Sequence, residues 1–473
     1  MTPKKILSFA LGPVGGALLG FVSLPIITWF FSQEDIGRIA MLNVVVGFCT
    51  LFFSLGLDQA YVREFHEVSN KPALLKASFF PGLTLLIISL CVLLSFGNTI
   101  SLWLFEVDSR LLSLLVALAV LCAFISRFLS LILRMNEQGF AYSMSQLLPK
   151  LLLIIIILGY VLFSVNKNIT NLVIANVAAI LLVFFIYAWN TRGEWIIGLK
   201  EKLDPSQLKG LLSFGMPLIF GSLAFWGLTA SDKILLKELS NYEQLGLYSV
   251  AVSFAAAATI IQSIFSTIWV PVVYKWAAAN EHLDKIFKVN RYVLLVVIIL
   301  FCLAGILSAV VTLILPDNYM AVQWILVPCL GYPLLYTLSE TSVIGLGITR
   351  RTGFSMLASV VAFGVNLLGN VWLIPKYGAI GAAISTCFSF WVFFILRTEF
   401  SIYFWKAIPR LGMYIYTTLL VLGSVVHALY GNSLQNYFTL YWCLILLSLF
   451  FFFKNEIFES KKFIAQKILR VKS

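Results

Sequence analysis

The sequence predicts an all-α polytopic membrane protein: about fourteen transmembrane helices, forming two pseudo-symmetric six-helix lobes plus two C-terminal helices. Hydrophobic residues make up 60% of the 473 residues and charged residues 11%, whereas a soluble domain typically carries about 25% charged residues. Apolar stretches of roughly 20 residues, the length of one span, recur from end to end. The second half of the chain also begins as a divergent copy of the first.

Each predicted span is an apolar run bounded by charged residues, proline or glycine. Runs such as Leu151 to Leu158 do not alternate as barrel strands would, and a helix satisfies its backbone polar groups within one segment. The predicted helices lie near 6–30, 38–62, 77–97, 111–133, 141–164, 168–190, 210–232, 244–273, 290–315, 321–347, 353–374, 379–396, 411–430 and 434–453.

The distribution of Lys and Arg predicts the orientation. With the N-terminus inside, 25 of the 33 basic residues fall in inner loops and termini and 6 in outer loops. We therefore expect a multi-pass protein with both termini in the cytoplasm. The net charge of +12 is then explained by inner loops that meet anionic membrane lipids. The sequence contains no basic stripe with interleaved aromatic residues, so it does not predict a nucleic-acid partner.

An internal repeat relates the two halves. Three pairs of segments correspond, with separations of 205, 209 and 214 residues between Ser8 and Ser213, Gly37 and Gly246, and Gly139 and Gly353. With six spans in the first copy, the two copies run in the same direction through the membrane. A parallel repeat of this kind places a substrate site between two lobes.

The repeat defines the predicted domains. These are an N-lobe (1–190, helices 1–6), a cytoplasmic interlobe linker (191–209), a C-lobe (210–404, helices 7–12), and helices 13–14 with a basic cytoplasmic tail (405–473). We interpret the linker as an interfacial helix, because it is too short for a regulatory domain.

Three basic residues in spans 4 and 5 are candidates for a cationic cavity. A charge near the bilayer centre costs a few kcal/mol on insertion scales, so such residues usually face a bundle interior or water. Lys150 lies roughly 15 Å into span 5. Arg127 is two turns before Arg134 on one face of span 4. Snorkelling of Arg134, and in part of Arg127, to the headgroups is the alternative.

Acidic residues in other spans suggest a gate or an ion-coupling site. Glu340 in span 10 is almost the repeat counterpart of Arg127, so the two are expected to face each other, either as a structural ion pair or as a gate. Weaker candidates of the same kind lie at the ends of spans 2 and 7. These are Asp58, Asp232 and Lys233, while Arg63, beside Asp58, is a weaker candidate for the cationic cavity; an ordinary interfacial charge is the alternative for all four.

Small and aromatic residues allow two interpretations each. Gly12, Gly16 and Gly20 form a stripe on span 1 that permits close helix packing, or a span that moves during transport. Four aromatic residues could stack on sugar rings, although packing is the commoner role in a chain with 15% aromatic residues. They are Trp226, Tyr248, Trp269 and Tyr274.

Motifs for enzyme chemistry are not found in the sequence. There is no G-x-x-x-x-G-K-[ST] loop for nucleotide and no visible Ser/His/Asp set, so we expect a transporter and not an enzyme. We expect no cofactor and no metal site, and leave proton or sodium coupling open.

Three segments resemble one family. The run Leu55 to Phe65 is similar to the segment after span 2 of bacterial O-antigen flippases, in the polysaccharide-biosynthesis branch of the MATE-like superfamily. Ser231 to Ile234, followed by Leu245 to Ala251, resembles the mid-chain signature of that branch. Ile374 to Ala383 resembles its turn between spans 11 and 12.

The resemblance implies a substrate and a place in the cell. Flippases of this branch move an undecaprenyl-pyrophosphate-linked oligosaccharide from the inner to the outer leaflet of the bacterial inner membrane, and the resemblance implies other polysaccharide assembly proteins as partners. A cationic cavity would hold the pyrophosphate through charge-assisted hydrogen bonds. The alternatives are a cation-coupled small-molecule antiporter on the same fold and a membrane glycan polymerase or ligase.

Overall fold

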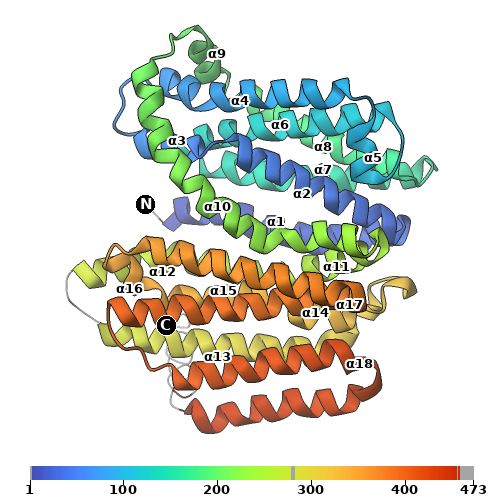
Figure 1. Cartoon of the computed structure of the whole chain (residues 1–473), viewed down its shortest axis with the longest axis vertical. Helices are drawn as coiled ribbons and strands as arrows, with labels where there is room; N and C mark the ends of the chain where they lie inside the picture. The colour runs from blue at the N-terminus through green and yellow to red at the C-terminus, as the bar shows by residue number, and fades with distance from the viewer. Residues whose placement is uncertain (1–2, 279–282, 455, 457, 459–473) are drawn as a thin grey trace, which may run out of the picture. The chain divides into compact units, whose positions relative to one another are not determined.

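The computed structural model describes residues 3–278, 283–454, 456 and 458, and every regular element in that part of the chain is a helix (Figure 1). The predicted basic tail beyond residue 458 lies outside the described residues. The chain divides into two compact units, Met1–Ser249 and Val250–Ser473. The predicted lobe boundaries at 190 and 210 differ from this division and stay a prediction.

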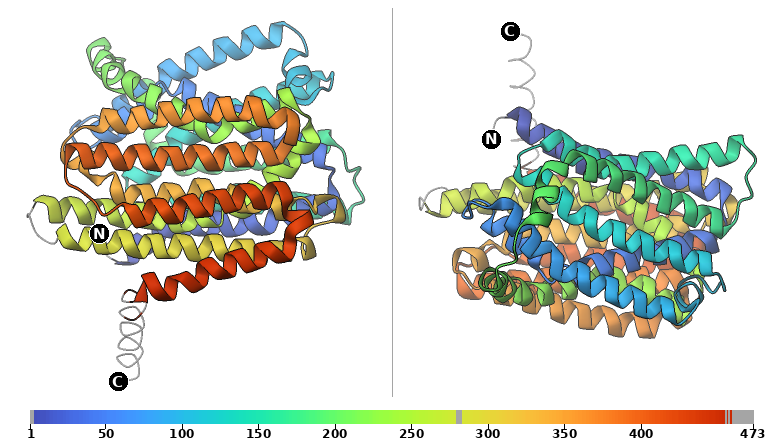
Figure 2. Two further views of the ribbon diagram at one scale, coloured as in Figure 1. Left: turned by 60° about the horizontal axis from the view of Figure 1, so that its bottom comes forward. Right: turned by 90° about the horizontal axis from the view of Figure 1, so that it is seen from above.

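Unit 1 is a bundle of long helices that run side by side (Figures 1 and 2). Asn and Ser side chains cap several of them; Ser32, for example, accepts a hydrogen bond from the Asp35 amide at the start of α2. The helices are α1 Pro3–Phe30, α2 Gln33–Phe53, α3 Leu57–Glu64, α4 Lys71–Ser95, α5 Thr99–Phe105, α6 Arg110–Met135, α7 Gly139–Leu162, α8 Ile169–Asn190, α9 Arg192–Lys200, α10 Pro205–Leu239 and α11 Tyr242–Ala255, whose last turns belong to unit 2.

Unit 2 contains two helical hairpins that are continuous except at one residue each. α17 has non-helical backbone angles at Gly378 and α18 at Leu434, so each comprises two successive spans. The elements are α12 Ala258–Ala278, α13 Leu283–Leu307, η1 Ser308–Leu313, η2 Asp317–Tyr319, α14 Val322–Cys329, α15 Gly331–Ser342, α16 Ile344–Ile348, α17 Thr352–Phe404 and α18 Leu411–Phe452.

The predicted membrane spans are confirmed as helices. Ten helices in the described part of the chain are long and apolar enough to cross a membrane, and α11 with α12 form one further span bent by 48°. α17 holds two of the predicted spans, and shorter apolar helices cover the first and the last. Three spans are broken where continuous helices were predicted: span 2 between α2 and α3, span 8 between α11 and α12, and span 10 among α14, α15 and α16. The protein is therefore a multi-pass membrane protein.

The helix α10 packs on α2 and α3 and belongs to unit 1. The contact is close because two glycines meet: a Cβ at Gly56 would lie 2.1 Å from the Gly215 carbonyl oxygen. This close approach explains why α10, the predicted seventh span, is part of the first compact unit.

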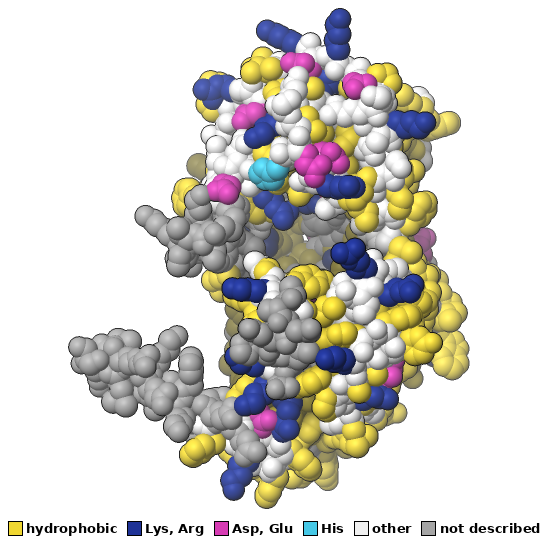
Figure 3. Space-filling model, turned by 90° about the vertical axis from the view of Figure 1, so that its left-hand side faces the viewer, with side chains coloured by type: hydrophobic (Ala, Val, Ile, Leu, Met, Phe, Trp, Pro, Cys, Tyr) yellow, Lys and Arg dark blue, Asp and Glu magenta, His cyan; other side chains and the backbone are white. Residues whose placement is uncertain are grey.

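The predicted linker forms the short helix α9, which is fixed to α4. The Lys76 ammonium donates hydrogen bonds to the carbonyls of Leu199 (2.8 Å) and Glu201 (2.6 Å) at the end of α9. Asp204 then caps α10, and hydrogen bonds from Ser206 lower the pKa of its carboxyl group. Lys and Arg side chains crowd the helix ends of each unit on the face shown in Figure 3.

Candidate functional site

A break in span 2 sets the position of Asp58. Leu55 and Gly56 have left-handed backbone angles (φ 53° and 70°), which end α2 and start α3 in a new direction. Asp58 lies in the first turn of α3, where the helix dipole favours a negative charge. Its side chain is only 6% exposed. The segment that resembles the flippase family thus turns a carboxylate into the bundle.

Asp58 forms an ion pair with Arg127 from α6. The Arg127 Nη2 atom lies 2.9 Å from the Asp58 Oδ2 atom, and Gln59 donates a 3.3 Å hydrogen bond to the same oxygen. The Arg127 side chain is 45% exposed although it lies within a membrane span. Of its five N–H donors, one is used by Asp58, and no other described residue accepts from it. Arg127 therefore keeps donors available for a ligand.

The ion pair lines a cavity of about 640 Å³ in unit 1. This volume lies within the range of small-molecule sites, roughly 300–1,000 Å³. Helices α2, α3, α6, α7, α8 and α10 supply the lining. The lining residues are Gly47, Thr50, Leu51, Ser54, Asp58, Ala123, Ser126, Arg127, Ser130, Tyr142, Ser145, Gln146, Pro149, Ile180, Val183, Tyr187 and Trp226.

The charges in this cavity cancel. Arg127 and Asp58 are the charged residues of the lining, so its formal charge is zero and not the positive charge that the sequence analysis predicted. The neutral polar groups are rich in hydroxyls: Ser130 and Ser145, for example, line the cavity and donate to backbone carbonyls, which leaves their oxygens as acceptors. The cavity thus combines polar side chains with apolar surface, carries no net formal charge, and has one guanidinium that can be approached.

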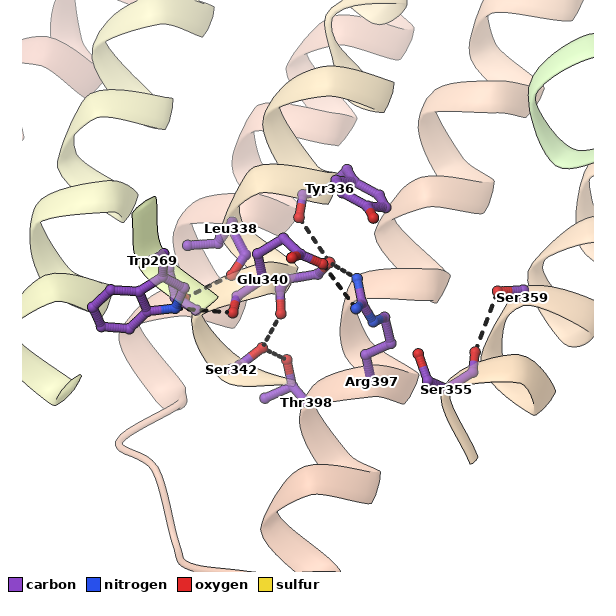
Figure 4. A network of polar contacts seen from close by, with 11 residues as sticks. Trp269, Tyr336, Leu338, Glu340, Ser342, Ser355, Ser359, Arg397 and Thr398 are labelled. Carbon is purple, nitrogen blue, oxygen red and sulfur yellow. Dashed lines mark hydrogen bonds and ion pairs between the residues drawn. The ribbon is translucent and has the colours of Figure 1, made fainter. Parts of the chain in front are cut away.

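A second ion pair lies in unit 2, and it is closed to solvent (Figure 4). The Arg397 Nη2 atom lies 2.9 Å from Glu340 Oε1, and the two side chains are 8% and 10% exposed. Arg397 also donates to the Ser339 hydroxyl (2.7 Å), and the Trp269 indole donates to the Glu340 carbonyl (3.2 Å). A cavity of only about 170 Å³ adjoins this pair. The interactions fit a structural pair better than a ligand site.

These two sets of residues occupy equivalent places in the repeat. Trp269, Glu340 and Arg397 follow Asp58, Arg127 and Tyr187 by 211, 213 and 210 residues. The cluster of each unit thus comes from three equivalent spans, 2, 4 and 6 in one and 8, 10 and 12 in the other. The arginine is on span 4 in unit 1 (Arg127) and on span 12 in unit 2 (Arg397). The expected pairing of Arg127 with Glu340 is replaced by a partner for each within its own unit.

The remaining predicted basic residues lie elsewhere in unit 1. Lys150 is half-buried and donates to the Gly16 carbonyl of α1, where a Cβ at Gly20 would lie 3.0 Å from its Nζ atom. The glycine stripe of α1 is thus a packing surface for α7. Arg134 is exposed in the last turn of α6. Lys150, Arg134 and Arg63 were predicted to form the cationic cavity together with Arg127. None of these three residues lines it.

Arg63 and the pair in span 7 have local contacts. The exposed Arg63 lies 3.7 Å from Glu64 and stacks over the Phe214 ring at 4.3 Å. Asp232 is buried in α10 and accepts a hydrogen bond from the Tyr248 hydroxyl, while Lys233 is half-buried. A role of these residues in gating or coupling stays a prediction.

Sequence reasoning missed several polar residues. Arg397 was assigned to an inner loop, which is wrong, because α17 continues to Phe404 and buries it. Arg397 is the repeat equivalent of Tyr187, and this correspondence could have indicated that Arg397 belongs to the polar cluster. Asn366 and Asn370, one turn apart in α17, were also missed; they bond to each other (2.9 Å), and Asn366 bonds to Thr386 (3.2 Å) in the second arm of the hairpin.

The geometry defines a class: a multi-pass, all-α membrane protein with a polar cavity among its spans. The chain belongs to the family described as polysaccharide biosynthesis protein, whose match covers residues 3–277. Membership of this branch, predicted from the three segments, is thereby confirmed.

Solved structures support the fold. The chain is similar to the lipid II flippase MurJ in an inward closed conformation, with a TM-score of 0.68 and 16% identity, over 95% of this chain and 99% of that one. It is also similar to an inward-facing multidrug resistance MATE family transporter of the MOP superfamily, with a TM-score of 0.59 and 12% identity, over 85% and 96% of the chains. At these identities the likeness concerns the fold alone.

One curated relative is described as the probable low-salt glycan biosynthesis flippase Agl15 of Haloferax volcanii. It is 21% identical over 197 residues, which are 41% of this chain and 42% of that protein. The chain thus spans less than half of the length of this relative.

Proposed function

We propose that the protein is a flippase for an undecaprenyl-pyrophosphate-linked oligosaccharide, an O-antigen unit or a related surface-polysaccharide unit. Membership of the polysaccharide biosynthesis family and the likeness to a curated glycan flippase support this substrate class. The observation that carries the proposal is a half-exposed arginine, Arg127, at a polar cavity formed by membrane spans. Such a site suits a polar, anionic head group whose lipid tail stays in the bilayer.

Arg127 is the proposed contact for the pyrophosphate. Guanidinium groups bind phosphate oxygens through charge-assisted hydrogen bonds, which are stronger than neutral ones. Asp58 positions the guanidinium and competes with the phosphate for it, because it already accepts from Nη2. The competition keeps binding from becoming so tight that the head group is not released.

The proposal includes a direction and a cycle. The bacterial inner membrane is the proposed location, with both termini in the cytoplasm, and alternating access would carry the head group to the periplasmic leaflet. The chain itself performs no covalent step in this cycle. Proton or sodium coupling, and roles for Asp232 and Lys233 in it, belong to the same proposal.

Transport of a fluorescent undecaprenyl-pyrophosphate oligosaccharide in proteoliposomes tests this function. We expect the wild-type protein to accelerate movement between leaflets. Loss of a charged hydrogen bond, worth about 1.5–3 kcal/mol, should lower the affinity of Arg127→Ala by about ten- to a hundredfold. Arg134→Ala, which changes an exposed arginine outside the cavity, is the matched control.

One outcome would contradict the proposed function, and another only the proposed phosphate contact. Wild-type protein that moves no lipid-linked glycan, but exports a cationic drug along a proton or sodium gradient, would favour the antiporter. Equal transport by wild type and Arg127→Ala would keep the flippase and exclude Arg127 as its phosphate contact.

A further inference from the structure

The cavity in unit 1 has two parts with different chemistry. One part holds the Asp58–Arg127 pair, near the break that follows Ser54. The other lies along α2 towards Gly47, seven residues from Ser54 and thus about 10 Å away. At this second part the Trp226 indole nitrogen lies 3.7 Å from the position of a Cβ on Gly47. The aromatic ring is therefore separated from the charges by about two helical turns.

The Trp226 ring is fixed in place and its N–H remains available. Phe48 packs against it with ring centroids 5.1 Å apart at 52°. Trp226 comes from α10, which packs on α2. In the described part of the chain, no residue accepts a hydrogen bond from its indole N–H. A rigid aromatic surface with a free donor thus faces the cavity.

Two further polar groups of the lining have no partner among the described residues. The Ser126 hydroxyl is buried and makes no hydrogen bond. The Gln146 carboxamide, with two donors and one acceptor oxygen, likewise bonds to no described side chain or backbone group. Unsatisfied polar groups in a cavity are sites where a polar ligand, or water in its absence, makes hydrogen bonds.

The chemistry of these groups matches a neutral sugar ring. A pyranose presents C–H groups on a face, which pack on the negative face of an aromatic ring, and hydroxyls on its rim, which both donate and accept. An indole, an amide and a hydroxyl in the lining of one cavity provide these contacts. A cationic ligand is disfavoured, because the acid of the cavity, Asp58, is already paired with Arg127.

The other aromatic candidates are engaged differently. Trp269 is buried and donates to the Glu340 carbonyl, and Tyr248 is buried and donates to Asp232. Tyr274 packs so closely on Gly347 that a Cβ there would meet its hydroxyl. Of the four aromatic residues, Trp226 is the one in the lining of the large cavity.

We propose that Trp226, with Gln146 and Ser126, forms a subsite for a sugar ring of the lipid-linked glycan, distinct from the phosphate contact at Arg127. This inference rests on the proposed function and adds which residues read the glycan. It makes Trp226 and Gln146 determinants of glycan selectivity, whereas Arg127 recognises a group common to all such lipids.

The test compares two lipids that differ only in the sugars. Binding of undecaprenyl pyrophosphate, with and without its oligosaccharide, is measured on the full chain in nanodiscs. We expect Trp226→Leu to weaken binding of the glycan lipid about two- to tenfold, the range of one aromatic contact, and to leave the sugar-free lipid unchanged. Trp226→Phe should retain most of the affinity, and Gln146→Ala should act as Trp226→Leu does.

Control variants separate this inference from the proposed function. Arg127→Ala should weaken both lipids, and Trp189→Leu, at an exposed tryptophan outside the cavity, should change neither. Equal weakening of both lipids by Trp226→Leu, or no weakening of either, would overturn the sugar subsite and leave the flippase intact. A wild-type protein that binds neither lipid would overturn the proposed function and the subsite together.

Discussion

Gly37 and Gly246 lie 209 residues apart in the chain and meet face to face. A Cβ on Gly37 would lie 2.2 Å from the Tyr242 carbonyl oxygen, and one on Gly246 would lie 2.1 Å from that of Gln33. Gln33 and Tyr242 are themselves 209 residues apart. Reciprocal contacts between equivalent residues are the pattern found around a two-fold axis. The repeat that the sequence predicts is thus seen as a physical contact between the first turns of α2 and α11.

Substitution at this contact should destabilise the fold. Gly37→Ala or Gly246→Ala places a methyl group against a backbone carbonyl, which cannot move as a side chain can. Overpacking of this kind typically costs about 1–3 kcal/mol, and the double variant should cost more than either. Thermal unfolding of the purified protein in detergent measures the effect.

Gly159→Ala is the matched control, because no atom lies within 4 Å of a Cβ at that helical position. Its melting temperature should equal or slightly exceed that of the wild type, since alanine favours helix. Wild-type stability of both Gly37→Ala and Gly246→Ala would mean that α2 and α11 do not approach each other this closely.

The two ion pairs should respond differently to the loss of one partner. Arg397→Gln leaves Glu340 buried without its cation, which typically costs about 3–5 kcal/mol. Arg127→Gln should cost less, because Asp58, although only 6% exposed, lies in the first turn of α3 and keeps hydrogen bonds from Ser54 (3.5 Å) and Gln59 (3.3 Å). Unfolding midpoints of the two variants, compared side by side, check this order.

The double variant Glu340→Gln with Arg397→Gln removes both buried charges and should recover part of the lost stability. A larger loss of stability in Arg127→Gln than in Arg397→Gln would reverse the assignment of a structural role to unit 2 and of a ligand role to unit 1.

Hydrophobic length predicted the spans well, because burial in a bilayer requires it whatever the tertiary packing. The partner of Arg127 could not be predicted in the same way. Repeat arithmetic placed Glu340 opposite it, whereas the left-handed turn at Leu55 and Gly56 brings Asp58 to it. A turn of this kind changes direction within a span without interrupting the apolar pattern.

The distribution of charge also misled in one place. Counting Lys and Arg by loop assumes that a basic residue at the end of an apolar run is exposed. Arg397 is instead buried, and it forms an ion pair with Glu340. Lys150 was correctly placed within span 5, but its acceptor is a carbonyl of α1 that becomes accessible beside Gly20. Such a contact depends on which helix packs against the glycine stripe, which periodicity alone does not specify.

Lys150 should fasten α1 to α7. Its ammonium donates to the Gly16 carbonyl at the packing surface of the two helices. Lys150→Met retains the apolar stem and removes the donor, so we expect faster hydrogen exchange over α1, with exchange in α6 unchanged. Lys167→Met is the control for loss of charge alone. The Lys167 ammonium lies over the Phe30 ring at the other end of α1, so this variant tests whether any loss of charge there has the same effect. Unchanged exchange in Lys150→Met would show that glycine packing alone holds α1.

Asp58→Asn should strengthen phosphate binding and slow release. The carboxylate competes for the Arg127 guanidinium, and a pair whose cation is half-exposed is worth about 1 kcal/mol or less. Its removal should therefore tighten binding of undecaprenyl pyrophosphate by up to about fivefold, since a tenfold change corresponds to about 1.4 kcal/mol. In proteoliposomes the maximal transport rate should fall while the substrate concentration at half-maximal rate falls as well. Weaker binding by Asp58→Asn would instead show that Asp58 is needed to orient Arg127. Asp58→Asn combined with Arg127→Ala separates the two cases, because the gain in affinity requires the guanidinium and should disappear in that background.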